Sequence, residues 1–419
     1  MTGPAGVLDA LRQATSGHAE AAGDGDAVDG VPARFVAAPG STEEAATVLR
    51  TAAAGGLAVV ARGNGTKLGW GTPPRRLDLI VDTGRLDRVL EHAAGDLVVI
   101  AQAGVPLAAL GERLAGDRQR LAVDEVVPGT TVGGMLGTGV SGPRRLQVGA
   151  VRDLVLGVTM VRADGVVAKA GGKVVKNVAG YDVAKLVTGA YGTLGLVTEA
   201  AFRLHPVAPA AAYVSVRVPD AAGAYEAVQR ALHGQFVPAA IELDRPEPGG
   251  LVEVAVLVEG TEDGMTVRTA QAVEALGPGA AETERPDWWG RLPAAAGERD
   301  GVLVKATTEL TGLARLLDGI DRAAAAAGIA AAVRGSAGVG LVHAGLPGAD
   351  PAAVAAFVKA LRDAAPAWRG SVVVLAAPPS VRSEVDSWGP VPGLELMRRV
   401  KDQFDPGALL APGRFVGGI

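Results

Sequence analysis

The sequence predicts an α+β protein of two domains, and three observations support that prediction. The chain has 419 residues, which exceeds the roughly 100–200 residues of one domain and suffices to bury a sizeable core. Helical and extended segments alternate as far as His205-Pro206. Beyond that point glycine clusters thin out and longer helical runs separate the strands, which is typical of helices packed on one face of a mainly antiparallel sheet.

The first half begins with a segment, residues 1–38, that we expect to be flexible, because residues 17–30 are rich in Gly and Asp and lack periodicity. A capping box at Ser41–Glu44 then predicts a helix that runs to Ala54 and stops at Gly55-Gly56. A short helix is expected at Pro106–Ala115, with proline in its first turn. The expected strands are Leu57–Ala61, Leu79–Asp82, Leu97–Ala101, Leu154–Val161 and Val166–Ala170.

The second half predicts a β-α-β-β-α order followed by β-α-β-α-β, as in two related halves. The expected helices are Ala221–Leu232, Thr261–Leu276, Leu310–Ala327 and Pro351–Ala365. The expected strands are Ala212–Val218, Ala239–Leu243, Leu251–Glu259, Val302–Thr307, Ala330–Val342 and Ser371–Leu375. Residues 393–419 are expected to form a short helix, an Asp-Pro turn and a terminal arm.

Composition excludes several classes of function. Hydrophobic residues make up 48% of the chain, so disorder is not the dominant state. A balance of 40 basic against 45 acidic residues argues against a nucleic-acid partner. The chain has no cysteine, which excludes disulfides, thiolate zinc sites and an iron–sulfur cluster held by this chain, and no two of its five histidines have metal-ligand spacing. We therefore expect an organic cofactor and no metal.

Membrane insertion and export are also not expected. The most apolar stretch, Leu97–Leu110, is interrupted by Gln102, Gly104 and Pro106, well short of the ~20 apolar residues that a spanning helix needs. The N-terminus has no basic start and carries Asp9 within its apolar run. A cytoplasmic protein without a transmembrane segment is expected.

Two glycine clusters carry the chemical signal. Arg62–Gly71 (RGNGTKLGWG) directly follows a predicted strand, and Val127–Gly142 reads VPGTTVGGMLGTGVSG. Successive N–H groups without an obstructing Cβ can bind phosphate; the alternative is that both clusters are only tight turns. No GxxxxGK[ST] motif occurs, and the GxGxxG at Gly137–Gly142 is preceded by further glycines and followed by Pro143, so a nicotinamide Rossmann site is not expected.

These clusters, together with KVVKNVAGYDVAKLVTGAYGTLGLVTEA, occur in an order and spacing that resemble the FAD-linked oxidases of the vanillyl-alcohol oxidase or p-cresol methylhydroxylase (PCMH) type. Within that family the motifs are most similar to the FAD-binding E subunit of bacterial glycolate oxidase, through Gly142–Arg145, Val175–Asp182 and Tyr191, where many relatives carry Glu. The resemblance implies a PCMH-type FAD-binding domain at 39–206, a smaller cap domain for substrate or subunit contact at 207–392, and an arm, 393–419, that returns to the FAD domain.

The resemblance also implies which residues bind FAD. The first loop would wrap the pyrophosphate, mostly through backbone N–H groups, and Lys67 is expected to be a flexible charge near solvent. The second loop would lie beside the flavin and its ribityl chain, and a later strand would contact the cofactor through its main chain. The implied positions are Gly63, Asn64, Gly65, Thr66, Lys67, Gly69, Pro128, Gly129, Thr130, Gly133, Gly134, Thr138, Gly139, Ser141, Gly195, Leu196 and Val197.

Departures from the family pattern carry information as well. The first loop has no His and the chain has no Cys, so FAD is expected to be noncovalent. The HxGDGNxH metal motif of relatives is replaced by Gly335–His343 with a single His, which is either a catalytic base or a structural residue. Arg144 and Arg145 are candidates for a carboxylate clamp or for a solvated or interface pair. Arg414 keeps the family's cation, but Ala411 replaces the preceding Asn.

By resemblance, the chain is expected to be the FAD-binding subunit of a 2-hydroxy-acid oxidase or dehydrogenase complex that oxidises glycolate to glyoxylate. The implied partners are a homologous flavoprotein subunit and an Fe–S subunit, and any membrane association would be peripheral and through those partners. Two alternatives stay open. One is a standalone FAD oxidase of a sugar, alditol or other 2-hydroxy acid, with His343 or Tyr191 as acid/base, and the other is a noncatalytic flavin-bearing scaffold.

Overall fold

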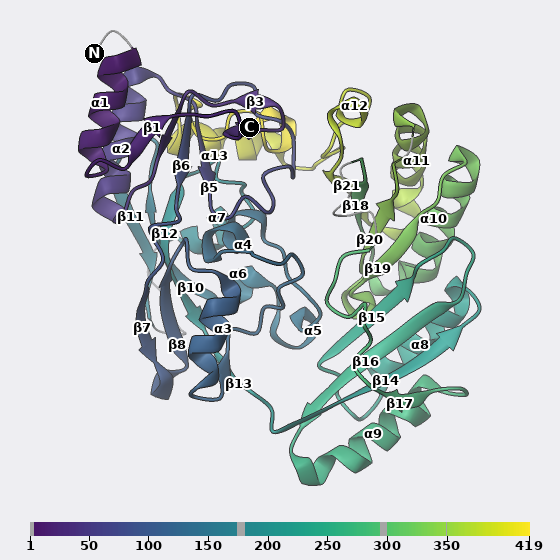
Figure 1. The fold of residues 1–419 in the computed structure, drawn as a ribbon. Coiled ribbons are helices and arrows are strands. Elements are labelled where there is room, and N and C mark those ends of the chain that lie inside the picture. Colours follow the sequence, from purple (N-terminus) through teal and green to yellow (C-terminus); the bar gives the residue numbers. More distant parts are fainter. Residues whose placement is uncertain (1–3, 174–180, 294–299, 349) are drawn as a thin grey trace. The chain divides into compact units, whose positions relative to one another are not determined.

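A computed structural model describes residues 4–173, 181–293, 300–348 and 350–419 (Figure 1). The chain divides into two compact units. Unit 1 comprises Met1–Ser141, Gly149–Pro206 and Pro390–Ile419, and unit 2 comprises Gly142–Val148 and Val207–Gly389. The short segment Gly142–Val148 therefore clusters with unit 2, although the chain on both sides of it belongs to unit 1. Val175–Gly180 of the expected VKNVAGYD motif lies outside the described residues.

The first sheet of unit 1 combines parallel and antiparallel pairs in the order β1-β4-β6-β5. These strands are β1 (Ala19–Ala21), β4 (Phe35–Ala37), β5 (Val59–Arg62) and β6 (Leu79–Asp82), and helices α1 (Pro4–Ala14) and α2 (Thr42–Gly55) accompany them. The N-terminal part differs from the expected flexible segment. Leu11 is fully buried and Val7 nearly so, in one apolar cluster with Leu49, because the Val7-Leu11-Ala14 spacing gives α1 an apolar face. The short strands β2 (Ala27–Val28) and β3 (Val31–Pro32) follow.

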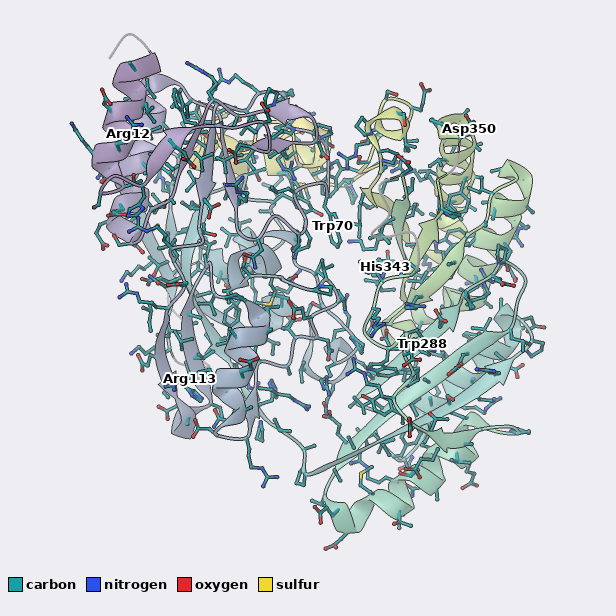
Figure 2. The ribbon with its side chains drawn as sticks, in the orientation of Figure 1. Arg12, Trp70, Arg113, Trp288, His343 and Asp350 are labelled. Atoms are coloured by element: carbon teal, nitrogen blue, oxygen red, sulfur yellow. The ribbon has the colours of Figure 1, made fainter. Side chains whose placement is uncertain are left out.

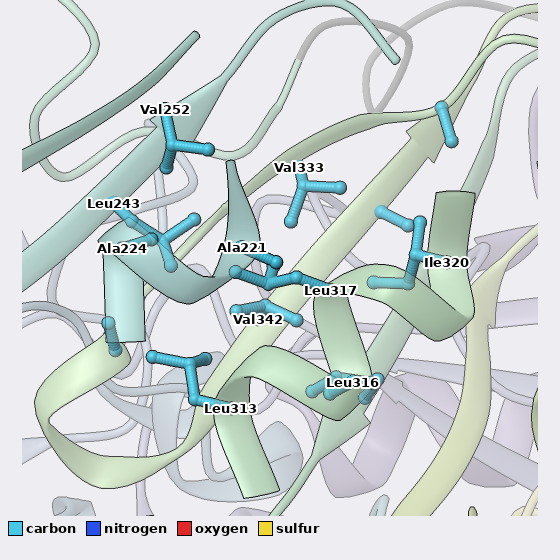
Figure 3. Close-up of a cluster of buried hydrophobic side chains, with 14 of the residues drawn as sticks. Ala221, Ala224, Leu243, Val252, Leu313, Leu316, Leu317, Ile320, Val333 and Val342 are labelled. Carbon is cyan, nitrogen blue, oxygen red and sulfur yellow. The ribbon is translucent and has the colours of Figure 1, made fainter. Parts of the chain in front are cut away.

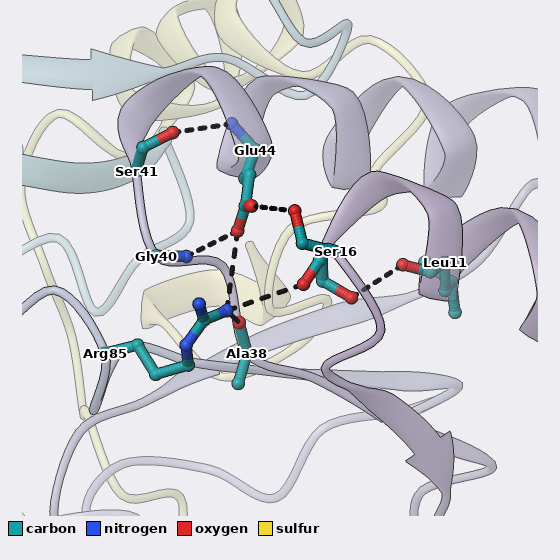
Figure 4. Close-up of polar contacts among 8 residues, drawn as sticks. Leu11, Ser16, Ala38, Gly40, Ser41, Glu44 and Arg85 are labelled. Carbon is teal, nitrogen blue, oxygen red and sulfur yellow. Dashed lines mark hydrogen bonds and ion pairs between the residues drawn. The ribbon is translucent and has the colours of Figure 1, made fainter.

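The expected capping box at α2 forms with one change (Figure 4). Ser41 Oγ accepts a hydrogen bond from the Glu44 N–H at 3.1 Å, and Gly56, with φ of 60°, ends the helix. The Glu44 carboxylate, however, accepts from the Gly40 N–H at 2.7 Å and from the Ser16 hydroxyl at 2.7 Å. The carboxylate therefore ties the first turn of α2 to the end of α1 and does not bond back to Ser41.

The second sheet of unit 1 is antiparallel, in the order β11-β10-β12-β8-β7. Its apolar face packs against the short helices that carry the second glycine cluster. The strands are β7 (Val89–Ala93), β8 (Val98–Gln102), β10 (Val155–Val161), β11 (Val167–Gly171) and β12 (Leu196–Arg203); β9 (Gln119–Arg120) pairs with β13 (His205–Pro206). The helices are η1 (Ala94–Asp96), α3 (Leu107–Ala115), α4 (Val132–Thr138), α6 (Val151–Leu154), α7 (Val183–Val187), α13 (Leu394–Phe404) and η5 (Val416–Gly418).

The C-terminal arm is built into unit 1. Val59 and Leu410 form a parallel bridge, so the arm extends the edge of β5. Lys401 Nζ is buried and bonds the Asp405 carboxylate at 2.6 Å, the Leu410 carbonyl at 2.8 Å and the Thr193 carbonyl at 2.8 Å. A buried cation with three partners holds the arm in place.

Unit 2 is an antiparallel sheet in the order β17-β14-β16-β15-β19-β20-β18-β21, with helices on one face (Figure 1). Its strands are β14 (Ala210–Val218), β15 (Ala240–Arg245), β16 (Val252–Gly260), β17 (Ala281–Thr283), β18 (Val302–Thr307), β19 (Ala332–Gly335), β20 (Leu341–Leu346) and β21 (Ser371–Ala376). Its helices are α5 (Arg145–Val148), α8 (Ala221–His233), α9 (Glu262–Leu276), η2 (Leu310–Gly312), α10 (Leu313–Ala327), η3 (Ala337–Val339), α11 (Pro351–Ala364), η4 (Ala365–Trp368) and α12 (Pro379–Arg382).

Every second residue of these strands enters the core under the helices. Leu243 of β15, Val333 of β19 and Val342 of β20 pack there against Leu316 and Leu317 of α10 (Figure 3). Members of this core cluster alternate along the strands, as Val252, Val254, Val256 and Val258 do in β16, so the intervening residues point to the opposite face of the sheet. The α+β class and the mainly antiparallel second sheet are thereby confirmed.

One expected strand is wrong. Residues 330–342 form two strands, β19 and β20, joined by a turn that contains η3. Gly340 has a φ of 66°, and a Cβ there would lie 2.2 Å from the Thr308 carbonyl oxygen. The glycines in this stretch are visible in the sequence, but the contact with the Thr308 backbone that requires the turn is not.

Candidate functional site

The first glycine loop leaves the carboxyl end of β5 and makes a close turn. Gly65 has a φ of 74°, a region that residues with a side chain rarely adopt. Gly63 is required for a different reason, because a Cβ there would lie 2.5 Å from Thr131 Oγ1 of the second loop. The two glycines therefore serve two purposes: one sets the turn, and the other allows the two loops to approach each other.

The second loop ends at the start of α4. Thr131 Oγ1 caps this helix by accepting from the Gly134 N–H at 3.1 Å. Asn64 Nδ2 donates to the Gly129 carbonyl at 2.9 Å, which joins the first loop to the second. Backbone and short polar side chains thus form one continuous wall from two segments that are about 65 residues apart in the sequence.

The loops line a cavity in unit 1 that is partly open to solvent. It is lined by most of the expected cofactor-binding positions, by parts of α4 and β12, and by Arg414 of the arm. The expected residues that line it are Gly63, Asn64, Gly65, Thr66, Lys67, Gly133, Gly134, Thr138, Gly195, Leu196, Val197 and Arg414.

Other expected positions lie behind this wall and support it. The Gly129 carbonyl accepts from Asn64, Gly139 ends α4 with a φ of 65°, and Ser141 Oγ accepts from the Val151 N–H at 3.0 Å. Thr130 Oγ1 donates to the Val127 carbonyl at 2.6 Å. Gly69 and Pro128 are likewise outside the lining. Their direct contact with a cofactor stays a prediction.

Lys67 differs from the expected flexible charge near solvent. Only 7% of the residue is exposed, and its Nζ lies 2.6 Å from Thr130 Oγ1 and 3.1 Å from Thr66 Oγ1. Burial lowers the pKa of Lys67 to about 8, although Glu125 raises it. The junction of the two loops therefore holds a buried amine that loses its proton near pH 8.

Tyr191 and Arg414 form another part of the cavity wall. Tyr191 has a φ of 56°, a strained conformation for a non-glycine residue, and its ring lies 5.8 Å from that of Phe415. Burial raises the pKa of the Tyr191 phenol, and nearby Arg414 opposes that effect. Arg414 Nη2 donates to the carbonyls of Leu68 and Trp70, both at 2.8 Å, so this arginine also holds the end of the first loop.

Unit 2 carries a row of charged residues across its sheet, on the face opposite the helices. In register order the row is Arg217, Glu253, Asp244, Arg334, His343 and Lys305. At one end the charges neutralise one another: Arg334 Nε bonds Asp244 at 2.6 Å and Arg217 Nε bonds Glu253 at 3.2 Å. At the other end stand His343 and Lys305, which are paired directly across β20 and β18.

This second end is electropositive. Burial, together with the positive charges of Lys305 and Arg145, lowers the pKa of His343 to about 3. Burial also lowers the pKa of Lys305, and Arg145 adds to that effect. Among the described residues, neither Lys305 nor His343 has a side-chain hydrogen bond or ion pair. Lys305 thus places a positive charge beside His343 without a carboxylate bonded to either side chain, and an anion would stabilise this arrangement.

The expected arginine pair is divided between two environments. Arg144 is held by Glu259, with Nη2–Oε1 and Nε–Oε1 distances of 2.9 and 3.1 Å, so its guanidinium already has a buried carboxylate partner. Arg145, by contrast, acts electrostatically on His343 and Lys305. Trp288 (labelled in Figure 2) and Trp289 belong to a small apolar cluster with Tyr213 and Leu257. The Arg334 guanidinium lies 5.9 Å from the Trp288 ring.

Sequence reasoning missed several of these residues. Thr131 and Gly192 line the cavity, and both adjoin motifs that the sequence does display. Lys305 gives no such signal, because a single lysine in an apolar strand is a common feature of strand edges and faces. No group of three or more His, Cys, Asp and Glu side chains within metal-binding reach occurs among the residues that the structure describes.

Comparisons with known proteins identify FAD as the cofactor. Residues 33–171 match the FAD binding domain family, and residues 386–415 match the C-terminal domain of FAD linked oxidases. An FAD-linked oxidoreductase of Mycobacterium tuberculosis is 28% identical over 91% of each chain. No helix of the described chain combines the length and apolar character needed to cross a membrane.

Two further relatives are similar over part of their length. A D-lactate dehydrogenase of Archaeoglobus fulgidus is 37% identical over 41% of this chain and 38% of its own. Glycolate oxidase subunit GlcE of Escherichia coli is 36% identical over 35% of this chain and 42% of its own. Among solved structures, a 4-ethylphenol oxidase from Gulosibacter chungangensis has a TM-score of 0.73, with 17% identity over 98% of this chain and 96% of that one, which shows a shared fold.

Proposed function

We propose that this FAD-dependent oxidoreductase, whose FAD-binding domain is of the PCMH type, oxidises a small 2-hydroxy acid. The fit of FAD to unit 1 rests on the cavity that both glycine loops line, on the close approach of these loops at Gly63, and on buried Lys67. Gly63–Lys67 and Gly133-Gly134 would hold the diphosphate, since they offer backbone donors and a cation. When bound, FAD supplies a two-electron acceptor for oxidation of the substrate Cα.

The observation that carries the choice of substrate class is the electropositive end of the charged row in unit 2. Lys305 is the proposed partner of the substrate carboxylate, because it has no competing acid partner among the described residues. A neutral sugar or alditol would leave the charge of Lys305 uncompensated. The similarity to a D-lactate dehydrogenase and to a glycolate oxidase subunit supports the same class.

His343 is the proposed base. In the free protein its pKa of about 3 makes it neutral at physiological pH. A carboxylate bound by Lys305 would offset the positive charge that lowers this pKa. The imidazole would then become a stronger base and could accept the proton of the substrate hydroxyl as oxidation proceeds. Binding of the acid and activation of the base are thereby coupled in one cluster.

We further propose that the chain works as one subunit of a glycolate oxidase type complex, with a homologous flavoprotein subunit and an Fe–S subunit as partners in the cytoplasm. The similarity to GlcE supports this assembly. A second candidate, a standalone oxidase of a sugar or alditol, is favoured by Tyr191, a buried phenol in the wall of the unit 1 cavity. A noncatalytic flavin-bearing scaffold is the third candidate.

Anaerobic mixing of the purified protein with glycolate, D-lactate and an alditol tests the substrate class. Bleaching of the flavin absorbance by a 2-hydroxy acid is expected, and bleaching by the alditol alone would contradict the proposal. If no substrate bleaches the isolated chain, the measurement is repeated on the complex with both partners, where failure would support the scaffold. Acid precipitation should release the flavin into solution, since noncovalent binding is proposed.

The role of Lys305 is tested by Lys305→Met. Loss of a charge-assisted contact is expected to raise KM for the acid about 10- to 100-fold, with unchanged FAD content. The matched control is Lys359→Met, which removes an exposed lysine from α11 on the helical face of unit 2 and should leave KM unchanged. An unaltered KM in Lys305→Met would show that the substrate carboxylate binds elsewhere.

A further inference from the structure

We propose that Lys67 recognises the diphosphate of FAD and that, in alkaline solution, its Nζ takes up a proton when the cofactor binds. This inference rests on the proposed placement of the diphosphate at the first glycine loop. In the reaction, a neutral amine and a proton from solvent become an ammonium ion beside the diphosphate, so no other co-reactant is needed.

The geometry of the amine supports the proposal. Lys67 lines the cavity, yet only 7% of the residue is exposed. Its Nζ contacts the hydroxyls of Thr130 and Thr66, and a Cβ built on Gly134 would lie 3.8 Å from it. The amine is thus placed where the first loop, the second loop and the first turn of α4 converge, and its contacts there are hydroxyl groups.

The neighbouring charges do not replace a ligand anion. Glu125, from the second loop, accepts the Thr130 N–H at 2.8 Å and raises the pKa of Lys67 less than burial lowers it. Arg62, on the same wall, is engaged with Asp26 and Asp82. Tyr191 and Arg414 are the other titratable or charged groups of the described lining. Without ligand, burial therefore dominates and favours the neutral amine from about pH 8 upward.

A bound diphosphate reverses this balance. Its negative charge, held in a site from which water is largely excluded, favours the ammonium form and raises the pKa of Lys67 above its value in the free protein. Linkage then fixes the sign of the effect: FAD affinity is constant below about pH 8 and falls as pH rises beyond it, up to the higher pKa of the complex. The slope in this window approaches one proton per cofactor.

The test is a titration of the apo-protein with FAD, followed by quenching of flavin fluorescence, at a series of pH values between about 6.5 and about 9.5. The Kd of the wild type is expected to be constant at low pH and then to rise close to tenfold per pH unit. ADP-ribose, which has the same diphosphate diester without the isoalloxazine, is titrated in parallel, because the flavin ring itself ionises at alkaline pH. It should show the same slope.

Two variants separate recognition from a structural role. Lys67→Met should bind FAD about 10- to 100-fold more weakly at neutral pH, with no slope below the range in which the flavin ionises. Lys67→Arg should restore tighter binding without the slope, since arginine stays charged. If Lys67→Met fails to fold, proton uptake is measured on the wild type by calorimetry in two buffers of different ionisation enthalpy.

A wild-type affinity that is independent of pH, or a slope that persists in Lys67→Met, would overturn the inference while leaving FAD as the cofactor. A protein that binds neither FAD nor ADP-ribose at neutral pH would overturn the diphosphate site itself. The two failures are therefore distinguishable.

Discussion

The glycine loops of unit 1 and the charged row of unit 2 differ in the groups that they present: backbone in the first, side chains in the second. In unit 1 the two glycine loops supply much of the cavity lining, where Gly65 permits the turn and Gly63 allows the loops to approach each other. In unit 2 the electropositive cluster is made of side chains, and its members Arg145, Lys305 and His343 come from three elements far apart in the sequence. The loops of unit 1 present backbone N–H groups to a ligand, whereas the cluster of unit 2 presents buried basic side chains.

The difference teaches that the two regions should respond to different perturbations. A backbone cradle loses its ligand when a Cβ changes its shape, whereas its stability depends little on pH. A buried charge cluster keeps its shape on substitution, but its stability depends on protonation. Lys67 is the exception that links the two, because it is a buried charge within the backbone cradle.

The largest effect is expected from Gly63→Val, because its Cβ would meet Thr131 Oγ1 at 2.5 Å and separate the loops. FAD binding should weaken by about 3–5 kcal/mol, or a few hundred- to a few thousand-fold. Gly65→Val should act similarly through its φ of 74°. Gly56→Ala is the control, with a φ of 60° and open space around the added Cβ. Flavin content decides the outcome, and full occupancy in Gly63→Val would contradict the assigned cradle.

Lys67→Met should stabilise the apo-protein while it weakens FAD binding. Burial lowers the pKa of Lys67 from 10.5 to about 8, which corresponds to a cost of about 3 kcal/mol for keeping the buried charge at neutral pH. Thermal melting of both proteins without FAD measures this gain. The difference should shrink as pH rises above about 8, where the wild-type amine is already neutral. A lower melting temperature in the variant would show that the lysine stabilises the free loops.

Acid should destabilise unit 2 through His343. Its pKa is about 3 in the folded protein and 6.5 as the ordinary value, so the unfolded chain binds the extra proton between these limits. Stability due to this group is present above about pH 6.5 and is lost as pH falls toward 3. His343→Asn removes that loss and should reduce the difference between neutral pH and pH 5 by about 1–2 kcal/mol. Urea unfolding at the two pH values measures it, and identical pH dependence in both proteins would refute the effect.

The smallest effect is expected at the aromatic cluster beside the row. Trp288→Leu removes the ring that lies 5.9 Å from the Arg334 guanidinium but leaves the Arg334–Asp244 bond of 2.6 Å intact. A loss of about 0.5–1 kcal/mol in the free energy of unfolding is expected. Urea denaturation measures it. Trp289→Ala, which removes a buried side chain, is the comparison. If Trp288→Leu lowers the free energy of unfolding as much as Trp289→Ala does, Trp288 contributes to the core.

The sequence by itself determined the elements whose signals are local. Ser41 and Gly56 bound α2 because capping requires particular side chains and particular backbone angles next to the helix. The glycine loops could likewise be predicted, since phosphate-binding backbone leaves its requirement for glycine in a continuous stretch of chain. The resemblance to FAD-linked oxidases rests on the same stretches, and the match of residues 33–171 confirms the cofactor.

Only the tertiary structure decided what depends on distant neighbours. Residues 330–342 look like one strand, but the Thr308 carbonyl requires the turn at Gly340. Lys67 looks like a solvated charge in its loop, but the second loop buries it against Thr130. Lys305 and His343 become neighbours only through the register of β18 with β20. The pKa of a group and the opposition of two strands are set by residues brought together on folding, so no local pattern in the sequence encodes them.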